Sequence, residues 1–168
     1  MSISMYQASA PRFANTLKNL SAILDKAKAH CEAKKIDPLV LTNTRLYPDM
    51  FALARQVQIA CDTAKGAVAR LAGAEVVKHE DSEKTFEELQ ARIAKTLALI
   101  EGFKPAQIDG SENRTIELKL GPNEVKWQGM QYLLGFAWPN FYFHVVTAYG
   151  ILRHCGVEIG KRDFIGTP

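Results

Sequence analysis

The sequence has few of the features that mark secreted or membrane proteins. Its 168 residues include only three cysteines, Cys31, Cys61 and Cys155, and no Cys-x-x-Cys pair. This pattern argues against a disulfide framework and favours small core residues in a reducing compartment. The N-terminal stretch does not have the basic start and apolar run that are typical of a signal peptide. No apolar stretch reaches the roughly 20 residues of a membrane span. We therefore expect a cytoplasmic protein without membrane contact.

The charge of the chain is also too small to suggest a charged partner. The net charge is only +3, and the lysines and arginines do not form a cluster. Because neither the whole chain nor any part of it is strongly basic, we expect no nucleic-acid partner. The phosphate-binding motif G-x-x-x-x-G-K is missing. Apolar residues make up 47% and charged residues 23%, as in ordinary globular proteins. Because no repeat or linker divides residues 1–168, we expect a single domain.

Three stretches show apolar residues at alternating spacings of four and three, which is typical of helices packed nearly parallel to their neighbours. They run from Tyr6 to Cys31, from Met50 to Leu71 and from Phe86 to Ile100. In the first stretch, Pro11 requires either a bend or a helix that begins at Ser9 with the proline in its first turn.

Local signals mark where the second and third helices begin and end. The second is expected to start near Pro48 and to stop at Gly73. The third opens with Thr85 and Glu88, which have capping-box spacing, and closes at Gly102.

After the third helix the period changes from helical to alternating. Ile116, Leu118 and Leu120 alternate with charged residues, a turn follows at 121–123, and Val125 and Trp127 alternate again. This pattern predicts a two-stranded hairpin within residues 115–128 that leans on the helices.

The last helix is predicted from Pro139 to Gly156, and its apolar stripe contains a lone histidine, His144. Together the elements predict an all-α protein, a four-helix bundle with a short β-hairpin inserted before the last helix. The connection between the first two helices, about fifteen residues, is long enough to cross one end of the bundle.

The last helix resembles that of the DinB/YfiT-like superfamily of proposed metalloenzymes, and the match is best with a bacterial branch known only as a domain of unknown function. His144 lies twelve positions before Gly156, as the second histidine of that superfamily's H-x-x-x-H pair does, and Asp163 follows. The resemblance implies a four-helix bundle with a crossing connection. It also implies a divalent metal held by three histidines, one from the second helix and two from the fourth.

This sequence departs from that metal-binding pattern at two of the three histidine positions. Asn140 stands four residues before His144, and Gln56 occupies the second-helix position, with Gln58 as the alternative register. Because amide oxygens are weak ligands for zinc or nickel, we expect no metal and no cofactor.

The remaining polar residues suggest a small pocket at the end of the bundle, lined by Gln56, Asn140, His144 and Tyr149. The simpler interpretation of His144 is a core histidine with one nitrogen hydrogen-bonded, and buried polar groups usually find such a partner. Asp62 is more simply a solvated charge than a site residue. The thiols of Cys61 and Cys155 lack the helix start or adjacent base that would activate them.

Three functions stay open, and whether the protein is an enzyme stays open with them. The first is a bundle with a degenerate metal site that binds a small ligand in the polar pocket. The second, which the resemblance implies, is a metal-dependent transferase that uses a thiol cofactor. The third is a structural or regulatory homodimer. The aromatic run from Tyr132 to Phe143 favours self-association, because exposed apolar surface usually marks a contact.

Overall fold

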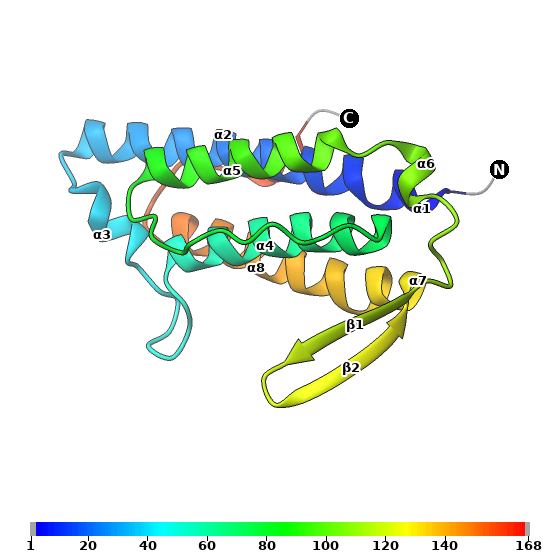
Figure 1. Cartoon of the computed structure of the whole chain (residues 1–168). Coiled ribbons are helices and arrows are strands. Elements are labelled where there is room, and N and C mark those ends of the chain that lie inside the picture. Colours follow the sequence, from blue (N-terminus) through cyan, green and yellow to red (C-terminus); the bar gives the residue numbers. More distant parts are fainter. Residues whose placement is uncertain (1–2, 167–168) are drawn as a thin grey trace.

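The computed structural model describes residues 3–166 and is built mainly from four long helices. Figure 1 shows them in two layers, one formed by α2 and α5 and the other by α4 and α8. The prediction of a mostly helical chain with a hairpin before the last long helix is confirmed. Their bounds are α2 (Ala10–Lys34), α4 (Leu53–Ala72), α5 (Phe86–Gly102) and α8 (Trp138–His154).

Short helices that the sequence pattern did not predict add to this count. They are one or two turns long, and most of them join or extend the long helices. Among residues 3–166, no helix has both the length and the apolar character needed to cross a membrane. The short helices are α1 (Met5–Ala8), α3 (Pro38–Thr42), α6 (Pro105–Ile108), α7 (Gly129–Tyr132) and α9 (Lys161–Ile165).

Pro11 decides where the first long helix begins. Ser4 caps α1 and forms a capping box with Gln7, and Ser9, at φ −118° and ψ −84°, interrupts the helical path. Pro11 then falls in the first turn of α2, where its missing N–H leaves no hydrogen bond unmade. The structure therefore shows the second of the two predicted alternatives: the long helix begins just after Ser9, and it does not bend at Pro11.

Helix α4 begins later than predicted. The expected start was Pro48, but the helix starts at Leu53, and residues 43–52 form a loop. The N–H of Leu53 donates to the carbonyl of Thr44 at 3.0 Å, which closes this loop at its base. The predicted end is confirmed, because Gly73 has φ 68°, a left-handed conformation that glycine adopts without a Cβ clash.

The connection that runs along the length of the bundle follows α4 (Figure 1). Residues 73–85, called the strap from here on, run from the end of α4 back to its beginning, so that α4 and α5 are parallel (Figure 1). Ion pairs fix this path: Asp81 pairs with Arg55 in the first turn of α4, and Glu83 pairs with Arg92 of α5. The connection between the first two long helices, residues 35–52, passes from one layer to the other at one end of the bundle, and α2 and α4 are antiparallel (Figure 1).

A π-helix precedes the last long helix. The stretch from Gln131 to Trp138, which the sequence pattern left unassigned, lies on a helical path that runs from α7 through the π-helix η1 (Leu133–Ala137) into α8. Pro139 lies in the first turn of α8. Because proline lacks an N–H and its ring crowds the preceding turn, the wider π turn relieves that crowding. The predicted end at Gly156 is confirmed by its φ of 86°.

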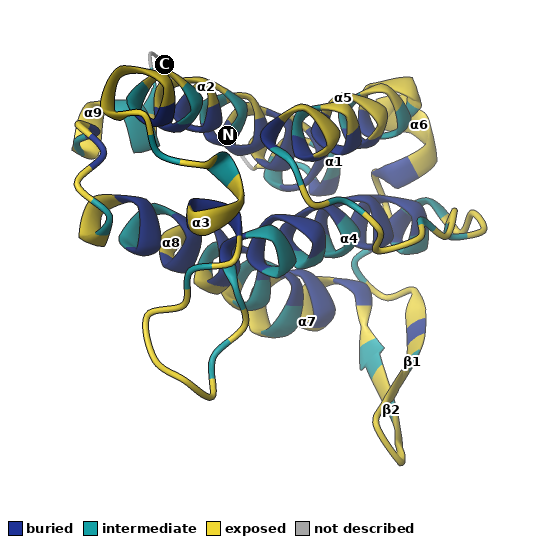
Figure 2. Ribbon diagram, turned by 90° about the vertical axis from the view of Figure 1, so that its left-hand side faces the viewer, coloured by how far each residue is buried: buried dark blue, intermediate teal, exposed yellow. Residues whose placement is uncertain are grey.

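The predicted hairpin consists of the antiparallel strands β1 (Thr115–Leu120) and β2 (Asn123–Gln128). At its base, the ring of Trp127 stacks on that of Phe136, with 5.2 Å between centroids. The outer part projects from the bundle and is mostly exposed (Figure 2). Only the base of the hairpin therefore leans on the helices.

The core fills the space between the two helical layers. Phe13 of α2 meets Phe141 of α8 edge to face, with 4.9 Å between ring centroids. Cys31 and Cys61 are fully buried here as free thiols. Burial raises the pKa of Cys61 to about 12, so this thiol is not a nucleophile at neutral pH.

Candidate functional site

Helices α4 and α8 run antiparallel and bring together two residues that are far apart in the sequence. Oε1 of Gln56, in the first turn of α4, lies 2.6 Å from Nδ1 of His144 in α8. Both side chains are buried, with exposed fractions of 1% and 7%. We call this line of contact between α4 and α8 the seam.

The hydrogen bonds of Gln56 determine which nitrogen of His144 carries the proton. Nε2 of Gln56 donates to the backbone carbonyl of Phe51 at 3.0 Å, and a carbonyl can only accept. The amide oxygen of Gln56 must therefore face His144, and since that oxygen also only accepts, Nδ1 of His144 is the donor. Nε2 of His144 is left with its lone pair.

This Nε2 atom retains contact with solvent. Within the described residues it has no hydrogen-bond partner, and it is not among the fully buried polar atoms that lack one. Burial lowers the pKa of His144 from 6.5 to about 4, and the positive charge of Arg55 adds to this effect. His144 is therefore a neutral imidazole at pH 7 whose accessible nitrogen accepts hydrogen bonds.

Asn140 continues the seam one turn before His144. Its Nδ2 donates to Oγ1 of Thr63, two turns further along α4, at 2.8 Å. The structure therefore places Gln56, Asn140 and His144 along one line, although each is already engaged in a hydrogen bond between the two helices.

Two other candidates lie elsewhere. Tyr149 follows His144 by five residues, which turns it about 140° around α8. Its ring packs against Phe164 of α9, with 5.9 Å between centroids. Gln58, the alternative register for the second helix, faces the strap, where its Nε2 donates to the carboxylate of Glu83 at 3.1 Å.

The three-histidine metal site that the resemblance implies does not fit these residues. One imidazole nitrogen is available, and the amides of Gln56 and Asn140 are held by their own hydrogen bonds. Within residues 3–166, no group of three histidine, cysteine, aspartate or glutamate side chains is placed to hold an ion. Catalytic zinc sites need about three such ligands, so the donor set is too poor for a tightly bound divalent metal.

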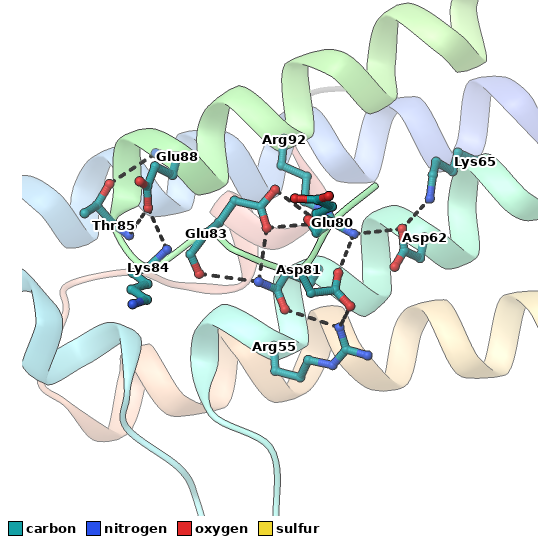
Figure 3. Close-up of polar contacts among 11 residues, drawn as sticks. Arg55, Asp62, Lys65, Glu80, Asp81, Glu83, Lys84, Thr85, Glu88 and Arg92 are labelled. Atoms are coloured by element: carbon teal, nitrogen blue, oxygen red, sulfur yellow. Dashed lines mark hydrogen bonds and ion pairs between the residues drawn. The ribbon is translucent and has the colours of Figure 1, made fainter. Parts of the chain in front are cut away.

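A second polar cluster, centred on Arg92, lies where α4, α5 and the strap meet (Figure 3). The side chain of Arg92 is 0% exposed. Its Nη2 lies 2.8 Å from Asp62 and 2.9 Å from Asp81, and its Nη1 lies 3.0 Å from Glu83. Lys65 also pairs with Asp62. Asp62, interpreted from the sequence as a solvated charge, instead belongs to this network.

The role of Arg92 was not predicted from the sequence, although its position in the helix carries a signal. Arg92 lies three residues after Leu89 and next to Ile93, so it falls on the buried stripe of its helix. A charged residue on such a stripe requires buried partners of opposite charge. The acidic residues of the strap, Asp81 and Glu83, were the nearest candidates in sequence.

The chain is similar to known proteins over almost its whole length. Residues 5–165 match the family DUF1993, a domain of unknown function. A DinB family member protein from Shewanella denitrificans, known from a crystal structure, has a sequence that is 48% identical to this chain, and the two structures superpose with a TM-score of 0.88. That match covers 97% of this chain and 92% of the other. Among curated proteins no relative matches the sequence.

Proposed function

The chain belongs to the DUF1993 family and is a DinB-type protein, and from this premise we propose that it binds a small protic ligand at His144 without a metal ion. One observation carries the proposal. The Phe51 carbonyl orients Gln56, and Gln56 in turn holds His144 in the tautomer that presents an unprotonated Nε2 at the seam.

The charges around the seam limit the chemistry of the ligand. A neutral imidazole accepts a hydrogen bond from an O–H, N–H or S–H group. The positive charge of Arg55 lies close enough to lower the pKa of His144, and it disfavours a cationic ligand. We therefore propose a neutral or anionic molecule with one such donor, and Asn140 supplies a second polar group one turn away.

The tautomer of His144 can be tested directly. In 15N NMR spectra at pH 7, we expect the signature of a protonated Nδ1 and a bare Nε2. A screen of small alcohols, thiols and amides should then raise the melting temperature of the wild type but not that of a His144→Phe variant. A protonated Nε2 at pH 7, or ligands that stabilise both proteins equally, would contradict the proposal.

Restoring the missing ligands should create a metal site. The double variant Gln56→His with Asn140→His is expected to bind zinc or nickel, because three imidazoles then converge where one is present now. Titration calorimetry on protein made without an affinity tag measures this. Neither single variant should bind appreciably.

The chain offers a matched control for this experiment. Gln58→His with Asn140→His adds the same number of imidazoles, but position 58 faces the strap. This control should gain no tight site. Stoichiometric metal bound through His144 in the unmodified protein would show that the ligand count argument is wrong.

A further inference from the structure

A charged side chain lies beside the Gln56–His144 pair without being part of it. Arg55 directly precedes Gln56 in the first turn of α4, and 38% of its side chain is exposed. Burial lowers the pKa of His144, and the positive charge of Arg55 lowers it further. The start of the seam therefore carries a positive charge next to a neutral imidazole.

One edge of the Arg55 guanidinium is not used by contacts within residues 3–166. The hydrogen bonds of Arg55 all come from Nη1, which pairs with Asp81 of the strap and lies 3.3 Å from Oε1 of Gln58 (Figure 3). Nε and Nη2 have no partner in this part of the chain, and neither is among its fully buried polar atoms. This edge therefore meets solvent. Its two N–H groups match the two oxygens of a carboxylate.

The loop before α4 holds the cation and the imidazole at one place. The carbonyl of Phe51 accepts from Nε2 of Gln56, and Oε1 of Gln56 contacts His144. The ring of the same phenylalanine lies 5.9 Å from the guanidinium carbon of Arg55. Phe51 thus contacts both Arg55 and the amide that orients His144.

Two exposed aromatic rings flank these polar groups. The ring of Phe51 lies against Arg55, and the ring of Phe143 packs edge-on against His144, with 5.2 Å between centroids. Phe51 and Phe143 are 53% and 57% exposed. Small-molecule sites typically combine a few polar groups with aromatic side chains of this kind. A ligand held by Arg55 and His144 can therefore bury an apolar group against these rings.

We propose that the ligand of the seam is a small hydroxy acid with an apolar group, whose hydroxyl donates to Nε2 of His144 while its carboxylate pairs with the Nε–Nη2 edge of Arg55. This inference rests on the proposed function and adds the negative charge and the residue that recognises it. The donor is a hydroxyl because a thiol donates only weakly. Asp81 is a positioning residue, since it holds Nη1 and leaves the opposite edge for the ligand.

Mandelate tests this inference, because it carries a hydroxyl, a carboxylate and a phenyl ring, and mandelamide is its neutral counterpart. In titration calorimetry at pH 7 and constant ionic strength, we expect the wild type to bind mandelate roughly tenfold or more tightly than mandelamide. Arg55→Met should bind both equally. Arg55→Lys keeps a cation that can pair with Asp81 but lacks the planar fork, so its preference for mandelate should be intermediate.

Arg70→Met is the matched control for the change of charge. Arg70 lies near the other end of α4, where it donates to the hydroxyl of Tyr132 at 3.3 Å, and its replacement lowers the net charge by the same amount. This variant should keep the wild-type preference for mandelate. An equal loss of preference in Arg55→Met and Arg70→Met would mean that the overall charge attracts the anion, and it would overturn the inference.

The His144→Phe variant separates this inference from the proposed function. If the wild type binds mandelate and mandelamide equally and His144→Phe binds neither, a ligand binds at His144 but the role of Arg55 is wrong. If His144→Phe keeps the wild-type affinity for mandelate, both proposals are wrong, because the anion then binds without the imidazole. A wild type that binds neither probe overturns this inference, while the tautomer measurement and the ligand screen still decide the proposed function.

Discussion

Replacing Arg92 with Met is expected to lower the free energy of unfolding by about 3 kcal/mol. The methionine occupies part of the same volume but leaves Asp62, Asp81 and Glu83 without their shared cation. Removing one partner of a buried ion pair typically costs about 3–5 kcal/mol. We expect the lower end of that range, because the three carboxylate side chains are 16–37% exposed and remain partly hydrated.

The same change should release the strap. Arg92 holds the strap through the carboxylates of Asp81 and Glu83 and through the carbonyl of Glu80, at 2.8 Å. Amide hydrogen exchange in residues 75–84 should therefore accelerate in the variant more than exchange in α8. The control is Lys95→Met on the exposed side of α5, which should change stability by no more than about 0.5 kcal/mol. Unchanged strap exchange in Arg92→Met would show that other contacts hold this segment.

The stability of the protein should also fall as His144 becomes protonated. The pKa of His144 is about 4 in the folded protein and 6.5 without burial, so the unfolded chain binds more protons between these values. The contribution is therefore fully present above pH 6.5 and is lost as the pH falls toward 4. The gap between the two pKa values corresponds to about 3 kcal/mol.

A variant without an ionisable group at this position isolates the effect. In His144→Asn, the Asn side-chain N–H₂ group can still donate to Gln56, but the titration is removed. Denaturant unfolding at several pH values should show the wild type losing about 3 kcal/mol more than the variant between pH 7 and pH 4. Burial also lowers the pKa of His79, but that contribution is common to both proteins and cancels. Parallel pH profiles would mean that His144 is not desolvated.

The positions of the helix ends show how far local sequence carries the fold. The caps at Gly73, Thr85 and Gly156 depend on residues within one turn, and each was predicted correctly. The start of α4 was predicted wrongly at Pro48, which is a favourable residue for the first turn of a helix. Residues 43–52 form a loop instead, and a hydrogen bond from the N–H of Leu53 to the carbonyl of Thr44 closes this loop. That bond joins residues nine positions apart, beyond the range of a capping pattern.

The site depends on helix rotation as well as on spacing. Asn140 and His144 share a face because they are one turn apart, and the sequence alone shows this. Whether Gln56 or Gln58 faces them depends on how α4 is rotated against α8, and the structure selects Gln56. The misplacement of Tyr149 has the same origin, since a residue five positions away leaves the seam for the contact with α9.

By itself, the sequence determined which segments form the long helices, which faces they bury, and that Asn140 and His144 lie one turn apart on the same helix. These properties follow from residue type and from periods of two and 3.6, which act within a few residues of chain. Only the tertiary structure decided that the strap crosses along α4, that Arg92 is buried among its carboxylates, and that Gln56 keeps Nε2 of His144 unprotonated. Each of these depends on the register and rotation of segments that are distant in sequence, and no local period encodes such relations.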